Sequence, residues 1–149
     1  MAREIQRFQV AIKAFVLERG RLLVLRERAG VGLWEIPGGR VEVGEEAFAH
    51  EDVLRRELAE ELGSAFSCRI GAPCVTWVRP VEPHRQSFTF LVGLECTEPR
   101  GEILLSDEHC ELRWVADGEW RSLALAPGYV GAFENFWRRQ RGAKVEEKA

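Results

Sequence analysis

The chain has 149 residues, enough for one domain with a hydrophobic core. Hydrophobic residues make up 46% of it and charged residues 30%, which is typical of a soluble globular protein. The net charge of −3 excludes a general attraction to nucleic acids or anionic membranes, and no apolar run approaches the roughly 20 residues that span a bilayer. Residues 1–15 lack the apolar stretch and cleavage site of a signal peptide. We therefore expect a cytoplasmic protein that binds neither nucleic acid nor membrane.

The first half of the chain predicts a β-hairpin, a glycine-rich turn and a helix. The two hairpin strands and a short extended segment are expected at residues 9–17, 22–26 and 34–36. Gly38 and Gly39 predict a turn. The helix is expected to begin between residues 46 and 50 and to end at Leu62, with Gly63 as its C-terminal stop.

The second half predicts three strands, a helical turn and a C-terminal helix, with a proline-containing loop after the first of these strands. The strands are expected at residues 68–78, 87–96 and 112–115, and the loop at residues 79–86. The helical turn is expected at residues 119–123 and the C-terminal helix at residues 128–141. Strands that alternate with two helices indicate an α/β domain with a mixed sheet. Residues 1–142 then form a single domain, followed by a charged flexible tail at residues 143–149.

The four cysteines are widely spaced and form no Cys-x-x-Cys pair. Reduced, buried thiols are the simplest interpretation in a cytoplasmic protein, and a structural zinc site is not expected. The cysteines are Cys68, Cys74, Cys96 and Cys110.

Three glutamates, Glu57, Glu60 and Glu61, occupy the last turns of the expected helix. Carboxylates near a helix C-terminus oppose the macrodipole, and Glu57 and Glu61 are a like-charge pair four residues apart. None of the three is followed by a basic residue four positions later, and unit charges about 4 Å apart repel by roughly 1 to 4 kcal/mol. Hard oxygen ligands suit Mg²⁺ or Mn²⁺, which would turn this repulsion into attraction. Taken alone, the three acids are equally compatible with a solvated acidic helix end.

The residues around this helix resemble the Nudix box. In that family a glycine is followed after five residues by a glutamate, and after seven more by the segment Arg-Glu-apolar-x-Glu-Glu-x-Gly-apolar. Gly39, Glu45 and residues 56–63 fit this pattern, and residues 33–39 resemble the lead-in found in many members. The chain departs from the pattern in two places, because ten residues separate Glu45 from Arg56 and Ser64 replaces the last apolar residue.

This resemblance implies a Nudix hydrolase with an α/β/α sandwich fold and a mixed sheet. It implies Mg²⁺- or Mn²⁺-dependent hydrolysis of a nucleoside diphosphate linked to another moiety. The metal ligands that it implies are the carbonyl of Gly38 and the side chains of Glu57, Glu60 and Glu61. Glu57 would also act as the base or orient it. The structural residues of the box would be Gly39, Glu45, Arg56 and Gly63.

The three extra residues before Arg56 are expected to lengthen the loop, or the first helical turn, at residues 47–50. In the family the arginine braces the loop by pairing with the glutamate, and the insertion weakens the case for a contact between Glu45 and Arg56 here. The metal-binding end of the helix lies beyond the insertion and is expected to keep its geometry.

A further acid after the box is expected from the resemblance, because many members carry one before a Glu-x-x-Trp segment. Glu108, six residues before Trp114, fits this position as a base or an additional ligand, beside Glu57 and Glu60 as the other catalytic acids. The alternative is that Glu108 only solvates a loop. His109 is interpreted as a loop histidine without a catalytic role.

The sequence does not identify the substrate. Arg28, Trp34 and Arg79 are weak candidates for substrate contacts. Pro80 lies 16 residues after the box, where a proline resembles the subgroup marker of ADP-ribose pyrophosphatases, so ADP-ribose-like substrates are slightly favoured. Cleavage of (d)NTPs is one alternative, and a Nudix-fold regulator that binds a nucleotide-type molecule without cleaving it is another. A homodimer through the C-terminal helix or the hairpin is left open.

Overall fold

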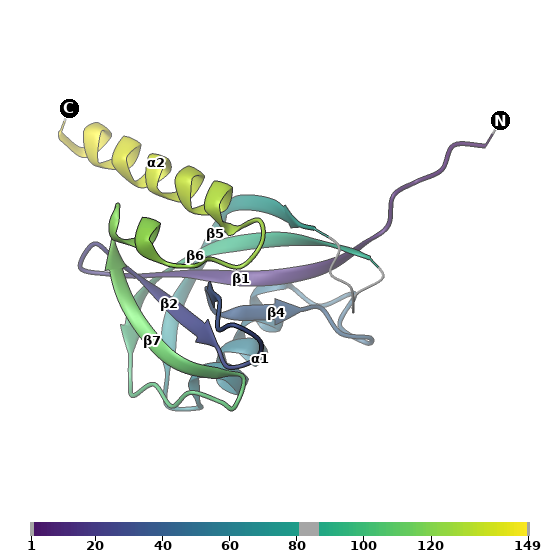
Figure 1. The fold of residues 1–149 in the computed structure, drawn as a ribbon, viewed down its shortest axis with the longest axis horizontal. Coiled ribbons are helices and arrows are strands. Elements are labelled where there is room, and N and C mark those ends of the chain that lie inside the picture. The colour runs from purple at the N-terminus through teal and green to yellow at the C-terminus, as the bar shows by residue number, and fades with distance from the viewer. Residues whose placement is uncertain (1, 81–86, 149) are drawn as a thin grey trace.

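The computed structural model describes residues 2–80 and 87–148. A mixed β-sheet forms its middle layer, with one helix packed on each face (Figure 1). The α/β/α sandwich and the mixed sheet predicted from the sequence are therefore confirmed. Among the described residues, no helix is both long enough and apolar enough to cross a membrane.

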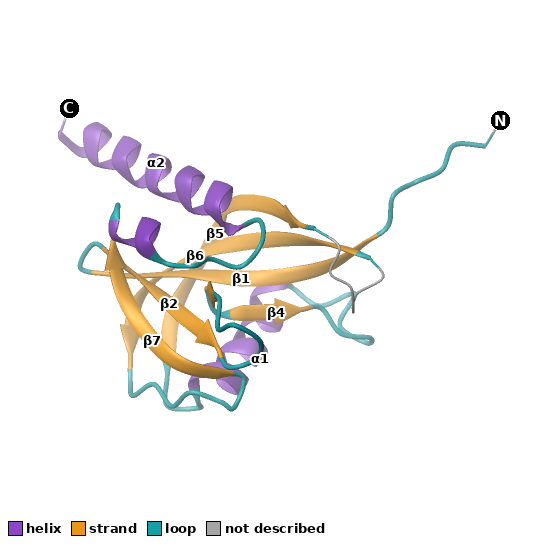
Figure 2. Cartoon of the chain, in the orientation of Figure 1, coloured by secondary structure: helices purple, strands orange, loops and turns teal. Residues whose placement is uncertain are grey.

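Four strands precede the first helix and three more follow it before the C-terminal helices, and Figure 2 distinguishes strands from helices by colour. The strands are β1 (Phe8–Glu18), β2 (Arg21–Glu27), β3 (Trp34–Glu35), β4 (Gly38–Arg40), β5 (Ser67–Arg79), β6 (Phe88–Arg100) and β7 (His109–Ala116). The helices are α1 (His50–Leu62), the short 3-10 helix η1 (Glu119–Ser122) and α2 (Tyr129–Lys148).

β1 organises the sheet because it pairs with three other strands. It runs parallel to β6 along one edge and antiparallel to both β4 and β2 along the other. β4 lies beside residues 11–13 of β1, whereas β2 lies beside residues 17–18. β5 pairs with β6, and both β3 and β7 pair with β2. β4 and β2 thus pair with different stretches of β1, and Lys13 of β1 lies opposite Gly38 of β4.

The two faces of the sheet carry separate hydrophobic clusters. On the α1 face, Leu54, Leu58 and Leu62 are buried, which confirms the apolar stripe expected from their four-residue spacing. On the α2 face the packing is aromatic, and the rings of Phe15 and Phe136 stack with their centroids 4.4 Å apart. The sheet is thus covered on both sides.

The predicted turn at Gly38 and Gly39 is wrong, because both residues belong to strand β4. Gly38 has φ +123°, and a Cβ atom there would lie 2.2 Å from the carbonyl oxygen of Ile12. A Cβ atom on Gly39 would lie 2.5 Å from the carboxyl group of Glu57. The glycines are therefore needed because β4 lies very close to β1 and α1, not because the chain reverses there.

Several elements are longer than predicted. β6 continues to Arg100, β7 begins at His109, and α2 continues to Lys148 instead of ending at residue 141. Gly142 does not stop α2, since a glycine costs a helix only about 1 kcal/mol and is followed here by good helix formers. Side chains 143–148 are exposed, and the flexibility of the tail stays a prediction. Most of the loop predicted at residues 79–86 lies outside the described residues.

Candidate metal and substrate site

The C-terminal end of α1 carries the acids and is closed by the loop that precedes β7. The carbonyl of Glu61 accepts a hydrogen bond from the backbone N–H of Ser106 at 3.1 Å, and that of Leu62 accepts one from Leu104 at 2.9 Å. These bonds satisfy carbonyls that are left open at a helix end. They also bring Glu108, which follows on the same loop, close to Glu61.

The contact between Glu45 and Arg56 is present despite the insertion. Arg56 donates from Nε to Glu45 Oε2 at 2.6 Å and from Nη2 to Glu45 Oε1 at 2.7 Å. Residues 46–49 form an exposed loop before the first helical residue, so the extra length bulges into solvent and leaves Arg56 in place. The doubt that the insertion raised about this contact is therefore removed by the geometry.

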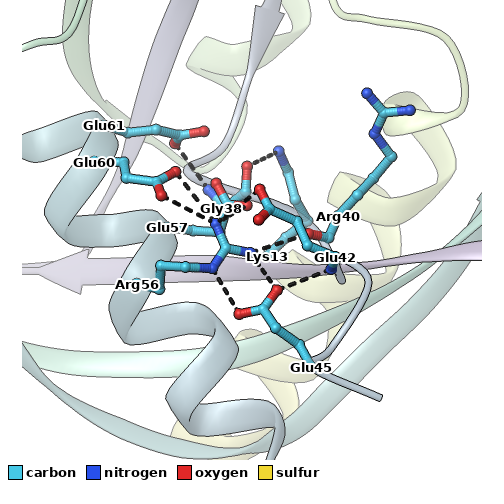
Figure 3. A network of polar contacts seen from close by, with 9 residues as sticks. All are labelled: Lys13, Gly38, Arg40, Glu42, Glu45, Arg56, Glu57, Glu60 and Glu61. Atoms are coloured by element: carbon cyan, nitrogen blue, oxygen red, sulfur yellow. Dashed lines mark hydrogen bonds and ion pairs between the residues drawn. The ribbon is translucent and has the colours of Figure 1, made fainter. Parts of the chain in front are cut away.

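Arg56 also holds two of the box glutamates (Figure 3). Its Nη1 lies 2.9 Å from Glu57 Oε1 and 3.2 Å from Glu60 Oε2. Glu57 and Glu60 therefore do have a cationic partner, which precedes them in the helix, although no basic residue follows either of them four positions later. Glu57 is buried and its pKa is raised, mainly by burial, whereas the Glu60 side chain is exposed.

Glu61 is the most deeply buried of the three acids, at 3% exposed. Its Oε2 accepts a hydrogen bond from the backbone N–H of Gly38 at 3.0 Å, which ties α1 to β4. Burial raises the pKa of Glu61 from 4.5 to about 7, although the nearby Lys13 ammonium opposes the shift. A bound cation would stabilise the ionised form that burial disfavours.

Lys13 lies under the site and was not identified from the sequence. Its side chain is buried in β1, and Nζ donates a 2.9 Å hydrogen bond to the carbonyl of Gly38. A carbonyl oxygen has two lone pairs, so one remains for a cation. The signal in the sequence was a single lysine within the apolar segment of residues 10–17, where a buried charge needs a partner.

The partner of Lys13 is Glu35, which is the centre of a buried charge network. Glu35 lies 3.7 Å from Lys13 Nζ, 3.8 Å from Arg79 Nη1 and 3.0 Å from His109 Nε2. Burial alone would raise the pKa of Glu35, but Lys13 and the His109 hydrogen bond outweigh it and lower the pKa. Arg79 also lies 3.9 Å from Glu27. Glu35 therefore remains an anion although it is buried.

His109 is not a loop residue as predicted, because it opens strand β7 and is 2% exposed. One of its ring nitrogens, a carboxylate oxygen of Glu61 and a carboxylate oxygen of Glu108 all lie within 4.8 Å of one another. Among the described residues, this trio is the one group of three or more such side chains that gathers so tightly. Glu57 and Glu60 are not members of this trio, and both lie against Arg56.

A large cavity, about 1570 Å³ in volume, opens over these groups. The box glutamates, Glu108 and His109 line it, and so do Arg28 and Arg79, two of the candidates for substrate contacts. Arg28 is already engaged, since it donates to the carbonyls of Asp107 at 3.0 Å and His109 at 3.4 Å. This pattern shows that Arg28 holds the loop that carries Glu108.

Trp34 does not line the cavity, in contrast to its selection as a candidate. It is 5% exposed and packs in the core on the α2 face, with the guanidinium of Arg113 4.8 Å from the ring centroid. Its apolar surface is therefore used for packing and is not available for a substrate.

The donor set at the end of α1 fits a divalent cation with a preference for oxygen. Glu57, Glu60, Glu61 and the Gly38 carbonyl all face the same region between α1 and β4, as Figure 3 shows. The absence of a side chain at Gly39 leaves the space in which the Glu57 carboxylate lies. Hard oxygen donors with little sulfur or nitrogen are the ligands that Mg²⁺ and Mn²⁺ take in proteins.

Comparison with known proteins agrees with this geometry. A protein of Bacillus subtilis (strain 168) named "Putative 8-oxo-dGTP diphosphatase" is 43% identical over 108 residues, which are 69% of this chain and 63% of that protein. A Salmonella arizonae protein named "Nucleoside triphosphatase NudI" is 31% identical over 98 residues, 60% of this chain and 65% of that protein. The chain thus aligns with less than two thirds of the length of these relatives.

Solved structures share the fold as well. The solution structure of the E. coli ORF135 protein matches with a TM-score of 0.76 at 23% identity and covers 91% of this chain and 92% of that one. The family model described as the NUDIX domain matches residues 7–134. These residues include every strand, α1 and all the site residues named above. The chain therefore belongs to the Nudix domain family.

Proposed function

We propose that this protein hydrolyses a pyrophosphate bond of a nucleotide, with Mg²⁺ or Mn²⁺ bound between α1 and β4. The observation that carries the proposal is one large cavity whose wall contains Glu57, Glu60, Glu61, Glu108 and the Gly38 segment. The phosphates of a nucleotide would be repelled by these acids, so substrate and site are compatible only when a cation lies between them.

The residues divide into those that hold the cation and those that position them. Glu57, Glu60, Glu61 and the carbonyl of Gly38 are the proposed ligands, and Glu57 or Glu60 is the proposed partner of the attacking water. A bound divalent cation polarises the phosphate and lowers the pKa of its water. Arg56 aligns two of the acids and ties them to the loop through Glu45, so its role is structural.

Glu108 is proposed as a further base or ligand. Its side chain is exposed at the cavity wall, where it can reach a substrate, and its loop is fixed to α1 and to Arg28. A carboxylate in this position can take a proton from the attacking water, a contribution worth roughly 10² to 10⁴-fold in rate.

Nucleoside triphosphates are the substrate class we propose first. The names of both relatives, an 8-oxo-dGTP diphosphatase and a nucleoside triphosphatase, support this choice. The slight preference for ADP-ribose-like substrates rests on Pro80 alone, which is exposed at the end of β5. ADP-ribose-like diphosphates are therefore the alternative.

The test is a product analysis by ion-exchange chromatography with and without Mg²⁺ or Mn²⁺. The substrates are dGTP, 8-oxo-dGTP, the other (d)NTPs, ADP-ribose and NADH. We expect a nucleoside monophosphate and pyrophosphate from a triphosphate, in a reaction that requires the cation. If the protein cleaves ADP-ribose to AMP and ribose 5-phosphate and leaves the triphosphates intact, the substrate class is ADP-ribose-like diphosphates and not nucleoside triphosphates.

Substitutions separate an enzyme from a nucleotide-binding regulator. Glu57→Gln and Glu60→Gln are expected to lower turnover on the order of 10²-fold or more. Glu51→Gln is the matched control, because Glu51 lies on the first turn of the same helix and forms an exposed ion pair with Arg55. Nucleotide binding without turnover of any substrate, in either metal, would show that the chain is a regulator and not a hydrolase.

A further inference from the structure

A second group of ligand atoms lies beside the box acids, at the junction of α1 and β7. It consists of one carboxylate oxygen each from Glu61 and Glu108 and one ring nitrogen of His109, all within 4.8 Å of one another. Ligands on opposite sides of one ion, each about 2.0 to 2.3 Å from it, are about 4 to 4.6 Å apart. The 4.8 Å limit lies just above this range, so a small approach of the three side chains lets a single cation contact all of them.

The state of His109 gives independent support for a ligand at this place. His109 is 2% exposed, and its Nε2 lies 3.0 Å from Glu35 Oε1. The other ring nitrogen, Nδ1, is buried and has no hydrogen-bond partner among the described residues. A buried polar atom without a partner is costly, so an unpaired Nδ1 on a ring that lies beside two carboxylates indicates that something binds there.

Glu35 determines which nitrogen is available. Its carboxylate is ion-paired with Lys13 at 3.7 Å and Arg79 at 3.8 Å, and a carboxylate can only accept a hydrogen bond from the imidazole. Nε2 of His109 therefore carries the hydrogen, and Nδ1 keeps its lone pair in the neutral ring. Histidines that bind metals usually donate their other N–H to a carboxylate in this way.

We propose that His109 is a metal ligand, through Nδ1, to a divalent cation that Glu61 and Glu108 also bind. The inference rests on the cation site of the proposed function and adds a nitrogen ligand that the box glutamates do not supply. Glu35 acts as a positioning residue, since it orients the imidazole without contacting the cation. A nitrogen ligand favours first-row transition metals such as Mn²⁺ over Mg²⁺ at this position.

The test uses the full chain with Mn²⁺ as the only added ligand. Pulsed electron paramagnetic resonance detects a nitrogen nucleus that is bound directly to Mn²⁺. We expect a ¹⁴N coupling in the unmodified protein, replaced by a ¹⁵N coupling when only histidine is labelled with ¹⁵N. This measurement requires no substitution and so does not depend on the folding of a variant. The absence of any nitrogen coupling at every Mn²⁺ occupancy would overturn the proposal.

Variants then assign the coupling to one histidine. His109→Gln is expected to abolish it and to weaken Mn²⁺ binding by at least about tenfold. His50→Gln and His84→Gln, at the other two histidines of the chain, are the matched controls and are expected to retain it. A coupling that persists in His109→Gln would overturn the proposal. Because no nucleotide is present, a failure of the hydrolysis assay leaves this result intact, and the two proposals fail separately.

Discussion

Replacement of Glu61 by glutamine tests the electrostatics of the site in the absence of a metal. Burial raises the pKa of Glu61 to about 7 in the folded protein, whereas the unfolded chain keeps the ordinary value of 4.5. The folded state therefore holds the proton more tightly than the unfolded state. The stability that results is complete below pH 4.5 and is lost as the pH rises to about 7. Glutamine has nearly the same shape and does not ionise, so it removes this dependence.

The difference between these two pKa values corresponds to about 3 kcal/mol of unfolding free energy. Glu61 is almost fully buried, so solvent does not screen this cost appreciably. In EDTA, we expect the unfolding free energy of the wild type to fall by about 3 kcal/mol more than that of Glu61→Gln between pH 4.5 and pH 8. Lys13, Glu35 and His109 also interact electrostatically with this carboxyl. The difference in unfolding free energy between the two proteins therefore includes any change in these interactions.

The assay is urea unfolding monitored by tryptophan fluorescence at several pH values in EDTA. Glu51→Gln on the exposed first turn of α1 is the control and is expected to follow the wild type. Addition of Mg²⁺ at pH 8 should restore stability to the wild type, by about 2.7 kcal/mol when the cation is at 100 times its Kd, and much less to Glu61→Gln. Parallel pH profiles for wild type and Glu61→Gln would show that burial does not control this carboxyl.

Further substitutions test the packing and charges around the site and the helical state of the C-terminal segment. Gly39→Ala places a Cβ atom 2.5 Å from the Glu57 carboxyl and should lower turnover at least tenfold, whereas Gly142→Ala, which meets nothing within 4 Å, should leave turnover unchanged. In a thermal melt, Gly142→Ala should stabilise the protein by about 0.5 to 1 kcal/mol if α2 is helical in solution, and no gain would indicate a frayed tail. Lys13→Met should cost about 3 kcal/mol in urea unfolding, because it leaves the buried Glu35 carboxylate short of a cation. The double variant Lys13→Met/Glu35→Gln should cost less than the sum of the single changes, and strict additivity would argue against the pair.

Local patterns were sufficient to predict the framework of the site. The four-residue spacing of Leu54, Leu58 and Leu62 determines which face of α1 is buried, and this face orients the box glutamates. Gly63 marks the end of the helix, as expected for a residue with φ +86°. These features depend on neighbours only a few residues away, so the sequence contains them directly.

The partners of the acids depend on which segments meet in space. Lys13, Glu35 and His109 belong to β1, β3 and β7, and nothing in their local sequence indicates that Lys13 and His109 meet at the Glu35 carboxylate. The effect of the insertion before Arg56 also depends on the three-dimensional arrangement. Arg56 can reach Glu45 because the extra residues form an exposed loop and do not extend the helix.

The sequence by itself determined the fold class, the helix with its three acids and the kind of ion that they suit. Only the tertiary structure decided that Glu61 is buried, that Arg56 holds Glu57 and Glu60, and that His109 faces the acids with one nitrogen unpaired. The physical reason is that helix and strand periodicity are local properties of the chain. Desolvation and charge pairing arise only when strands that are distant in sequence pack together and exclude water.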